Sequence, residues 1–318
     1  MEDVRILADE IIDGRRLTKE DNLNILKEAP LPEICDGADR LRAHFTGNRV
    51  DLCSIISGRN GSCSENCKFC AQSAYNHTGC EVYGLLDYEE IYALASSNEK
   101  AGVNRFAIVI SGHGPSDDDF EKIIAIFKRL RRELTIDLCA SLGFLTQEQF
   151  DRLYDAGVRR YHNNIETSPG FFKQICTSHT FEDKVSNIRR AQKAGLSVCS
   201  GGIIGMGETM DDRIEMAFSL SELGIKSIPV NTLIPIPGTP LQHLAALEND
   251  EIIRTIAIFK YINPEADIRL AAGRKLIHGN GEEAFMSGAS ATITGDMLTT
   301  SGSTIKSDRE MLERMGRI

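Results

Sequence analysis

Short runs of apolar and β-branched residues alternate along the chain with longer stretches in which apolar positions recur every three or four residues. The short runs predict strands at 50–57, 105–110, 134–140, 158–165, 196–204, 226–231, 267–271 and 289–294. The longer stretches predict helices at 88–101, 117–132, 146–156, 180–194, 210–223 and 250–262. About eight strand–helix units favour a parallel (β/α)8 TIM-type barrel, with a doubly wound open sheet as the alternative.

The ends of the predicted helices and of the chain complete this picture. A glycine directly follows four of the helices, where it takes the left-handed conformation without a side-chain penalty; these are Gly102, Gly157, Gly195 and Gly224. Helical patterns fill the first 48 residues, and 308–317 predict a terminal helix. We therefore expect an N-terminal helical extension at 1–48 and an α/β barrel at 49–318, without a linker or a repeat.

Composition narrows the functional classes. The chain has 36 Lys and Arg against 46 Asp and Glu, and its net charge of −10 argues against a nucleic-acid partner. No apolar run approaches the ~18 residues of a membrane span, and the acidic first residues are unlike a secretory signal. We expect a cytoplasmic protein without a membrane partner. Nine cysteines in a long chain of this kind favour metal binding or catalysis over a full set of disulfides.

The strongest chemical signal is a cysteine cluster between the first predicted strand and the next helix. Cys63, Cys67 and Cys70 have the spacing CxxxCxxC. Three thiolates can hold three irons of a [4Fe–4S] cluster and leave the fourth iron open to a ligand. The alternative is a structural zinc site, for which His77 or Cys80 could supply the fourth ligand.

This cluster resembles the CxxxCxΦC motif of the radical S-adenosylmethionine (SAM) enzymes, with Phe69 as the aromatic residue. The chain is most similar to the biotin synthases, over nearly its whole length from about residue 48. The motifs, in order, are CSENCKFCAQS (63–73), NIETS (164–168), CSGGIIGMGE (199–208), NTLIPIPGTPL (231–241), RLAAGR (269–274) and GDMLTTS (295–301). Each motif alone is weak evidence, but the set in this order is highly specific.

The resemblance implies a fold, cofactors and a reaction. The expected barrel holds a [4Fe–4S] cluster and SAM at its mouth and inserts sulfur into dethiobiotin. The open iron binds the amino and carboxylate groups of SAM, and an electron from a protein such as flavodoxin or ferredoxin cleaves SAM to a 5′-deoxyadenosyl radical. Whether the chain forms a homodimer is open. The alternatives are a related radical enzyme without sulfur transfer, of the hydrogenase-maturation or methylornithine-forming kind, and a zinc-stabilised binding protein.

The family takes its sulfur from a second cluster, usually a [2Fe–2S] cluster held by three cysteines and an arginine. Cys139, Cys199 and Arg269 match three of these positions, but Ala107 stands at the fourth. Side chains in one layer of a (β/α)8 interior come from alternate strands, here the third, fifth and seventh. The first strand should supply the missing member, and it carries Cys53. We therefore expect Cys53 to complete the ligands of an auxiliary cluster that differs from the usual [2Fe–2S] type.

The roles of the other cysteines and of the arginine are less clearly indicated by the sequence. Cys176 is the reserve ligand for the auxiliary cluster, Cys35 reads as a buried apolar side chain, and Cys80 stays unassigned. Arg269 is an unusual metal ligand because its guanidinium is always protonated. Its alternative role is that of a buried charge paired with an acid or with the sulfides of the cluster.

Further residues are assigned by the resemblance to cofactor and substrate. Asn164 and Glu166 would lie near the ribose hydroxyls of SAM, with Glu166 where the family usually has aspartate, and Lys184 would lie near the SAM carboxylate. Asn231 would bind the ureido ring of dethiobiotin, because an amide both donates and accepts. Gly201 and Gly202 would let the backbone approach a ligand. Three histidines lack a matching acid spacing, so a structural role is expected for His113, His162 and His179.

Overall fold

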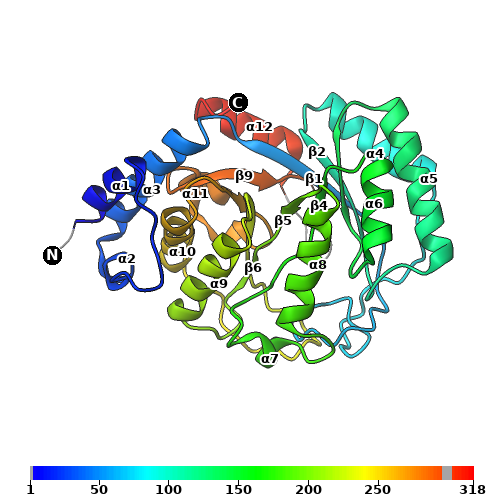
Figure 1. Cartoon of the computed structure of the whole chain (residues 1–318), viewed down its shortest axis with the longest axis horizontal. Helices are drawn as coiled ribbons and strands as arrows, with labels where there is room; N and C mark the ends of the chain where they lie inside the picture. Colours follow the sequence, from blue (N-terminus) through cyan, green and yellow to red (C-terminus); the bar gives the residue numbers. More distant parts are fainter. Residues whose placement is uncertain (1–2, 296–302) are drawn as a thin grey trace.

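The computed structural model describes residues 3–295 and 303–318 and is a closed barrel of parallel strands surrounded by helices (Figure 1). The strands are β1 (Asp51–Arg59), β2 (Arg105–Ile110), β3 (Asp137–Ser141), β4 (Arg160–His162), β5 (Ser197–Cys199), β6 (Gly202–Ile204), β7 (Ser227–Thr232), β8 (Asp267–Leu270) and β9 (Ala289–Ile293). They pair in the order β5-β4-β3-β2-β1-β9-β8-β7-β6, and β5 also pairs with β7, which closes the ring. The predicted (β/α)8 barrel is confirmed, and the open-sheet alternative is wrong.

The run at 196–204 is two strands, β5 and β6, where the sequence predicts one. A side chain at Gly201 would bring a Cβ within 1.9 Å of the Pro229 carbonyl oxygen, so the backbone of β7 passes too close for any other residue. Ser200 and Gly201 instead form the break between the two strands. The backbone N–H of Gly201 donates to the Asn164 side chain across this break (3.2 Å).

Helices follow the strands at the predicted places. They are α4 (Tyr88–Lys100), α5 (Asp117–Glu133), α6 (Gln147–Asp155), α7 (Phe172–Ile175), α8 (Phe181–Lys193), α9 (Met210–Glu222), α10 (Asn249–Ile262), α11 (Glu282–Phe285) and α12 (Ile305–Arg314), with 3₁₀ turns at Arg274–Leu276 and His278–Gly281. Reciprocal capping boxes start α4, α6, α8 and α9. The four predicted C-terminal glycines all have positive φ. The terminal helix α12 starts earlier than expected because the Thr304 hydroxyl caps the N–H of Ser307.

Three helices precede the barrel, as the sequence predicts: α1 (Val4–Ile12), α2 (Asn24–Glu28) and α3 (Leu31–Phe45). They lie beside α10 at one side of the ring (Figure 1). Helices α3 and α10 pack so closely that a Cβ on Gly37 of α3 would overlap the Tyr261 hydroxyl of α10. That hydroxyl also donates a hydrogen bond to the Val4 carbonyl of α1 (2.9 Å). In the described residues no helix is both long enough and apolar enough to cross a membrane.

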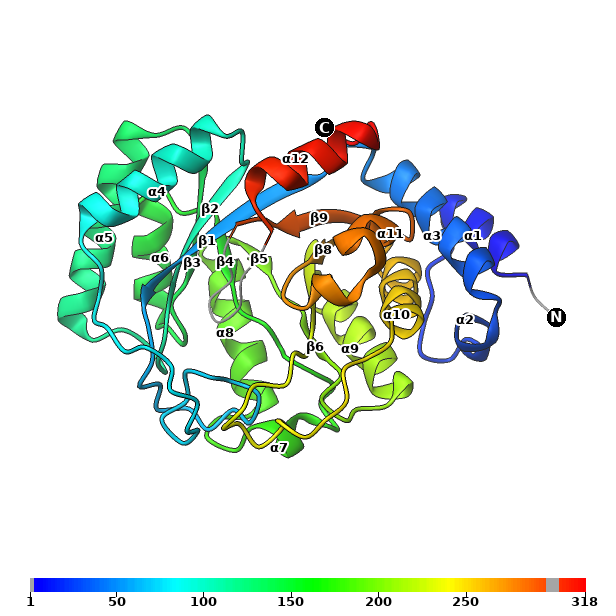
Figure 2. The same ribbon diagram turned by 180° about the vertical axis from the view of Figure 1, so that it is seen from behind.

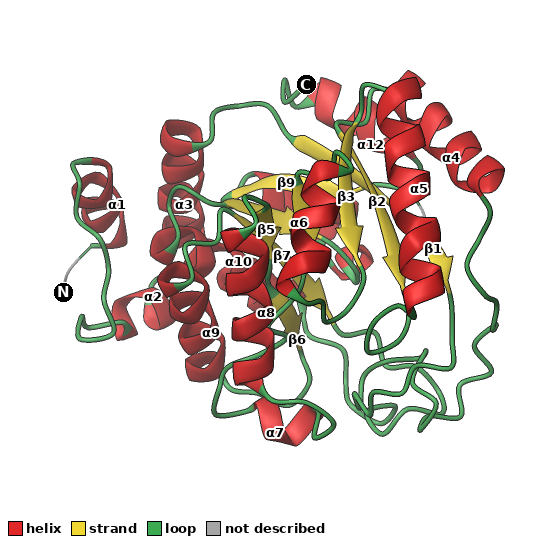
Figure 3. Cartoon of the chain, turned by 45° about the vertical axis from the view of Figure 1, so that its right-hand side comes forward, coloured by secondary structure: helices red, strands yellow, loops and turns green. Residues whose placement is uncertain are grey.

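The loops that leave the carboxyl ends of the strands gather at one end of the barrel. Figure 2 shows the long segment after β1, the loop around α7 and the segment after β7 together at this end, and Figure 3 shows the same loops below the strand tips. Backbone hydrogen bonds join these segments, from Lys68 to Ile175 (2.9 Å) and from His77 to Gly238 (3.1 Å). Because the carboxyl ends carry the active site in barrels of this kind, the chemistry is expected here.

Candidate active site

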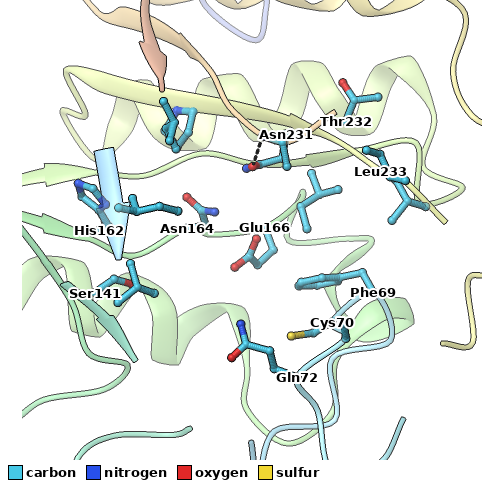
Figure 4. A pocket seen from close by; sticks show the side chains of 18 of the residues that line it. Phe69, Cys70, Gln72, Ser141, His162, Asn164, Glu166, Asn231, Thr232 and Leu233 are labelled. Carbon is cyan, nitrogen blue, oxygen red and sulfur yellow. Dashed lines mark hydrogen bonds between the residues drawn. The ribbon is translucent and has the colours of Figure 1, made fainter. Parts of the chain in front are cut away.

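A cavity of about 290 Å³ lies inside the carboxyl end of the barrel. Figure 4 shows Phe69, Cys70 and Gln72 on one side of it and Glu166 and other polar side chains on the facing side. Cys199 and Arg269 also line the cavity, and both are buried in the barrel interior. The cavity therefore joins the three-cysteine loop at the mouth to the cysteine-containing layer of the barrel.

The three-cysteine loop is folded tightly on itself. The amide of Asn76 donates to the carbonyl oxygens of Cys67 (3.1 Å) and Cys70 (2.8 Å), which fixes the second turn of the motif. The backbone N–H of Cys63 donates to the Gln72 carbonyl, and the Cys63 carbonyl accepts from the backbone N–H of Ala74. Burial raises the pKa of Cys70 to about 11, with a further contribution from the nearby Cys63. An unliganded thiol there stays protonated, and metal binding would have to displace its proton.

Cys176 follows α7 and lies beside the motif rather than in the barrel. Its Sγ is 3.7 Å from the Sγ of Cys67 and 3.5 Å from Nδ1 of His179. Its expected reserve role as a ligand of the second cluster does not fit this position, since no contact of Cys176 in the described chain reaches the buried cysteines of the barrel. The loop after α7 crosses back over the three-cysteine loop, which sets this position.

The histidines flanking this region do have an acidic partner. Glu65 lies within the cysteine motif, and its carboxylate contacts Nδ1 of His113 (2.7 Å) and Nδ1 of His179. Burial opposes the charge of Glu65, but hydrogen bonds, that of Ser178 first, hold its pKa below the usual range. No local spacing links His113 or His179 to an acid, as the sequence indicates, but the fold supplies Glu65 from 48 and 114 residues away.

The buried layer of the barrel brings Cys53 and Cys139 together. Both side chains are fully buried and lie close enough that their interaction lowers the pKa of Cys53 and raises that of Cys139. Cys199 lies close enough for Cys53 to influence its pKa, which burial raises, and its Sγ accepts a hydrogen bond from the Ser227 hydroxyl (3.3 Å). The side chains of β1, β3 and β5 thus meet in one place, as the layer rule predicts.

Arg269 occupies the same layer and is held by an acid. Its guanidinium forms an ion pair with Asp51 and donates to the carbonyls of Asp51 and Thr292 (both 3.1 Å). Burial opposes its charge, but Asp51 and the neighbouring thiols together raise the pKa of Arg269. The alternative role predicted for this residue, a buried charge paired with an acid, is therefore realised in the structure, and the positive charge faces the cysteines.

Two of the polar side chains assigned to SAM, Asn164 and Glu166, line the cavity, and the third, Lys184, lies beside Glu166. Glu166 has φ 70°, a left-handed conformation that is uncommon for a residue with a side chain, and its Oε1 lies 3.9 Å from Nζ of Lys184. Burial raises the pKa of Glu166, opposed by Lys184. Asn164 lines the cavity on the same side (Figure 4).

Gly202 and Asn231 both lie against the backbone of neighbouring segments. A Cβ on Gly202 would meet the Glu166 carbonyl oxygen at 2.3 Å, so Gly202 allows β6 to approach the strained turn at Glu166. The amide of Asn231 donates to the Gly202 carbonyl (3.1 Å) and accepts from the backbone N–H of Ala272 (3.2 Å). These bonds fix the Asn231 side chain on the cavity wall, with one N–H left to face a ligand.

Comparisons with known proteins agree with this geometry. The radical SAM superfamily profile matches residues 60–220, and that of the Biotin and Thiamin Synthesis associated domain matches 229–318. The chain is 54% identical over 310 residues to the biotin synthase of Clostridium beijerinckii, covering 98% of each chain. It is 52% identical to that of Alkaliphilus metalliredigens, covering 99% of each. The chain belongs to the biotin synthase family.

Solved structures share the fold. A methylornithine synthase superposes with a TM-score of 0.84 at 22% identity, over 98% of this chain and 96% of that one. A maturase of the [FeFe]-hydrogenase superposes with a TM-score of 0.82 at 18% identity, over 99% and 74%. At such identities the likeness shows the architecture alone.

Membership of the biotin synthase family excludes the zinc-stabilised binding protein, and in the described chain neither His77 nor Cys80 joins the motif cysteines in a metal-binding group.

The residues present fit the cofactors that the family implies, a [4Fe–4S] cluster and SAM. The three motif cysteines are free thiols. Oε2 of Glu166 is buried and has no hydrogen-bond partner among the described residues. A buried carboxylate oxygen without a donor costs free energy, so the site is incomplete without a ligand that carries hydroxyl or amino groups. Of the GDMLTTS motif used in the resemblance, residues 296–301 lie outside the described part of the chain.

His162 is a cavity residue that the sequence reasoning assigned only a structural role. It ends β4, pairs in register with Cys199 and lines the cavity (Figure 4). Burial, helped by the neighbouring arginines, lowers the pKa of His162 to about 3, so its imidazole is neutral. Its place in the carboxyl-terminal half of the predicted strand 158–165, towards the end of the barrel that carries function, was the available signal.

Proposed function

We propose that this biotin synthase family member converts dethiobiotin to biotin with sulfur from an auxiliary iron–sulfur cluster held by Cys53, Cys139 and Cys199, with Arg269 as the fourth group. The observation that carries the proposal is the meeting of Cys53 with Cys139 beside Cys199 beneath the cavity. It supplies a third thiol where Ala107 cannot serve. Because this ligand set differs from the usual one, we propose a cluster other than the usual [2Fe–2S] type.

At the mouth, Cys63, Cys67 and Cys70 would hold the [4Fe–4S] cluster. Together with SAM it supplies, when bound, a radical able to remove hydrogen from an unactivated carbon. Glu166 and Asn164 would accept hydrogen bonds from the ribose hydroxyls, and Lys184 would face the carboxylate of SAM. Gly201 and Gly202 would act indirectly, because they let the backbone pack against the carbonyls of Pro229 and Glu166 and so hold the turn that carries Glu166. Asn231 would use its remaining N–H to orient the ureido ring of dethiobiotin.

The protein's own electrostatics favour this use of the buried layer. Arg269 stays positively charged and lowers the cost of keeping thiolates and sulfides in a site without water. The neutral His162 adds no second positive charge to the cavity wall. We propose a flavodoxin- or ferredoxin-type electron donor, as the family resemblance implies, and a cytoplasmic location. A homodimer remains a prediction.

The deciding experiment is an anaerobic turnover of the protein after reconstitution with iron and sulfide, with SAM, a reductant and dethiobiotin. Mass spectrometry reads biotin and 5′-deoxyadenosine together. Both products support the proposal. Formation of 5′-deoxyadenosine without biotin would favour the radical enzyme without sulfur transfer, and absence of both, where a known radical enzyme works, would contradict the proposal.

Glu166→Gln tests the cofactor side of the site. The amide keeps the size of the side chain but removes the charge that would accept the ribose hydroxyls. Hydrogen bonds to charged groups contribute about 1.5–3 kcal/mol, so we expect SAM to bind the reconstituted protein about 10-fold or more weakly, with little loss of stability. Anaerobic calorimetry measures the affinity. Glu89→Gln, on the exposed face of α4, is the control, and an unchanged affinity in Glu166→Gln would remove Glu166 from the SAM site.

A further inference from the structure

Cys67 has a second set of neighbours that the proposed chemistry does not use. Its Sγ lies 3.7 Å from Sγ of Cys176, and that sulfur lies 3.5 Å and 3.8 Å from Nδ1 and Nε2 of His179. One atom from each of the three side chains lies within 4.8 Å of the others. Across residues 3–295 and 303–318 this is the one group of histidine, cysteine and acidic side chains close enough to hold a metal ion.

The distances match those of a zinc site. With zinc–sulfur bonds of about 2.3 Å and a zinc–nitrogen bond of about 2.0 Å, a regular tetrahedron has sulfur–sulfur edges of about 3.8 Å and sulfur–nitrogen edges of about 3.5 Å. The sulfur–sulfur separation and the separation of Cys176 Sγ from Nε2 of His179 differ from these by a few tenths of an ångström. Cys67 Sγ and the His179 ring lie within 4.8 Å of each other, so metal binding would draw these two side chains closer together.

Glu65 gives His179 the orientation of a metal ligand. Nδ1 of His179 is bonded to a carboxylate oxygen of Glu65, so the lone pair on Nε2 is free for a metal. Metal-binding histidines commonly donate their other ring N–H to a carboxylate in this way, which fixes the ring and its tautomer. The Ser178 hydroxyl also donates to Glu65. The hydrogen bonds that hold His179 through Glu65 are thus already formed without a metal.

The two loops that carry the three side chains are locked together. The side-chain oxygen of Asn66 accepts from the backbone N–H groups of Thr177 (2.9 Å) and Ser178 (3.0 Å), and its amide donates to the Thr177 hydroxyl (2.7 Å). Asn66 directly precedes Cys67, and Thr177 directly follows Cys176. The approach of the two sulfurs is therefore built into the backbone and does not depend on the two thiols alone.

We propose that the cluster-free protein binds one zinc ion through Cys67, Cys176 and Nε2 of His179, with water in the fourth position. Any protons still held by the two thiols and by Nε2 of His179 leave to solvent on binding, and the two thiolates neutralise the ion; no oxidation or reduction is involved. Because Cys67 cannot serve both metals, zinc at this site excludes the [4Fe–4S] cluster. The site thus makes cluster assembly sensitive to zinc, and this holds whatever the auxiliary cluster is.

Cobalt(II) is the probe for the site, because tetrahedral cobalt bound to thiolates absorbs strongly in the visible range. The iron-free, reduced protein is titrated anaerobically with cobalt and then with zinc. We expect one equivalent of thiolate-bound cobalt that zinc displaces. Cys176→Ala and His179→Gln should each weaken binding by at least about 10-fold. Cys80→Ala, another thiol of the same loop region, is the matched control and should bind as the unchanged protein does.

Cluster assembly gives an independent readout. Zinc added before iron and sulfide should slow formation of the brown cluster at the motif in the unchanged protein and in Cys80→Ala. It should have much less effect in Cys176→Ala and His179→Gln, which should both take up the cluster normally without zinc and so are folded. Cobalt binding or zinc inhibition that is the same in both site variants as in the control would overturn the proposal, since Cys63, Cys67 and Cys70 alone would then account for it.

Discussion

Replacing Cys53 with alanine should abolish biotin formation while SAM is still cleaved to 5′-deoxyadenosine. The variant keeps Cys63, Cys67 and Cys70 at the mouth but removes the thiol that lies beside Cys139 in the buried layer. Without it, two cysteines and an arginine remain, and a cluster bound by fewer thiolates is lost more readily. The measurements are the iron and sulfide content after anaerobic reconstitution, and both products in the same turnover assay.

Two cysteine variants control for loss of a thiol as such. Cys35→Ala changes a half-buried thiol of α3, outside the barrel, and Cys80→Ala changes a thiol that accepts a hydrogen bond from Asn60 in the loop after β1. Both should keep full iron and sulfide content and form biotin. A Cys53→Ala protein with unchanged iron, sulfide and biotin would show that Cys53 is only a small buried side chain. Loss of both products would instead point to misfolding, which the spectrum of the mouth cluster checks.

The sequence could predict the barrel and its buried layer because both follow from local patterns. The strands β2 and β8 begin at the residues where their apolar runs begin, Arg105 and Asp267. Once the resemblance had assigned Cys139, Cys199 and Arg269 to the third, fifth and seventh strands, the alternation rule pointed to the first strand and so to Cys53. Periodicity also predicts the direction of each side chain along a strand, so it could select Cys53 from its neighbours.

The sequence could not predict the loop contacts. Cys67 and Cys176 are 109 residues apart, and both lie in segments without helical or strand periodicity. Their approach depends on hydrogen bonds that the backbone N–H groups of Thr177 and Ser178 donate to the Asn66 side-chain oxygen, which no local pattern indicates. The break between β5 and β6 has the same origin, because it depends on Gly201 meeting the carbonyl of Pro229 on β7, a strand that is distant in sequence. Contacts between loops, rather than the core, thus limited the prediction of the site.

Asp51 is the acid on which the charge of the buried layer depends. Its carboxylate contacts Arg269, Arg105 (3.2 Å) and Arg160 (3.6 Å). Burial alone would raise the pKa of Asp51, but the three arginines, Arg269 first, outweigh it and hold the pKa below the ordinary value of 3.8. Without this carboxylate, the buried guanidinium of Arg269 would face two other positive side chains with no partner.

Asp51→Asn should therefore lower the free energy of unfolding by about 3 kcal/mol at pH 7, because removing one partner leaves a buried charge uncompensated. A carboxylate whose pKa is lowered by folding stabilises the protein above its unfolded-state pKa, and this contribution is lost as the pH falls through the folded-state pKa. The difference between the two proteins should hold from pH 7 to pH 5 and shrink below about pH 4. Urea unfolding of the reduced, iron-free proteins at each pH measures it.

Asp137→Asn is the matched control, because Asp137 also pairs with Arg105 (2.6 Å) but its side chain is 52% exposed. An exposed pair contributes about 0–1 kcal/mol, so this variant should unfold nearly as the unchanged protein does. Equal losses in the two variants would mean that Arg105, rather than the buried Arg269, is the charge that needs the acid. A small loss in Asp51→Asn would mean that the carbonyls of Asp51 and Thr292 suffice to hold Arg269, and that its charge is available to the cluster without an acid to balance it.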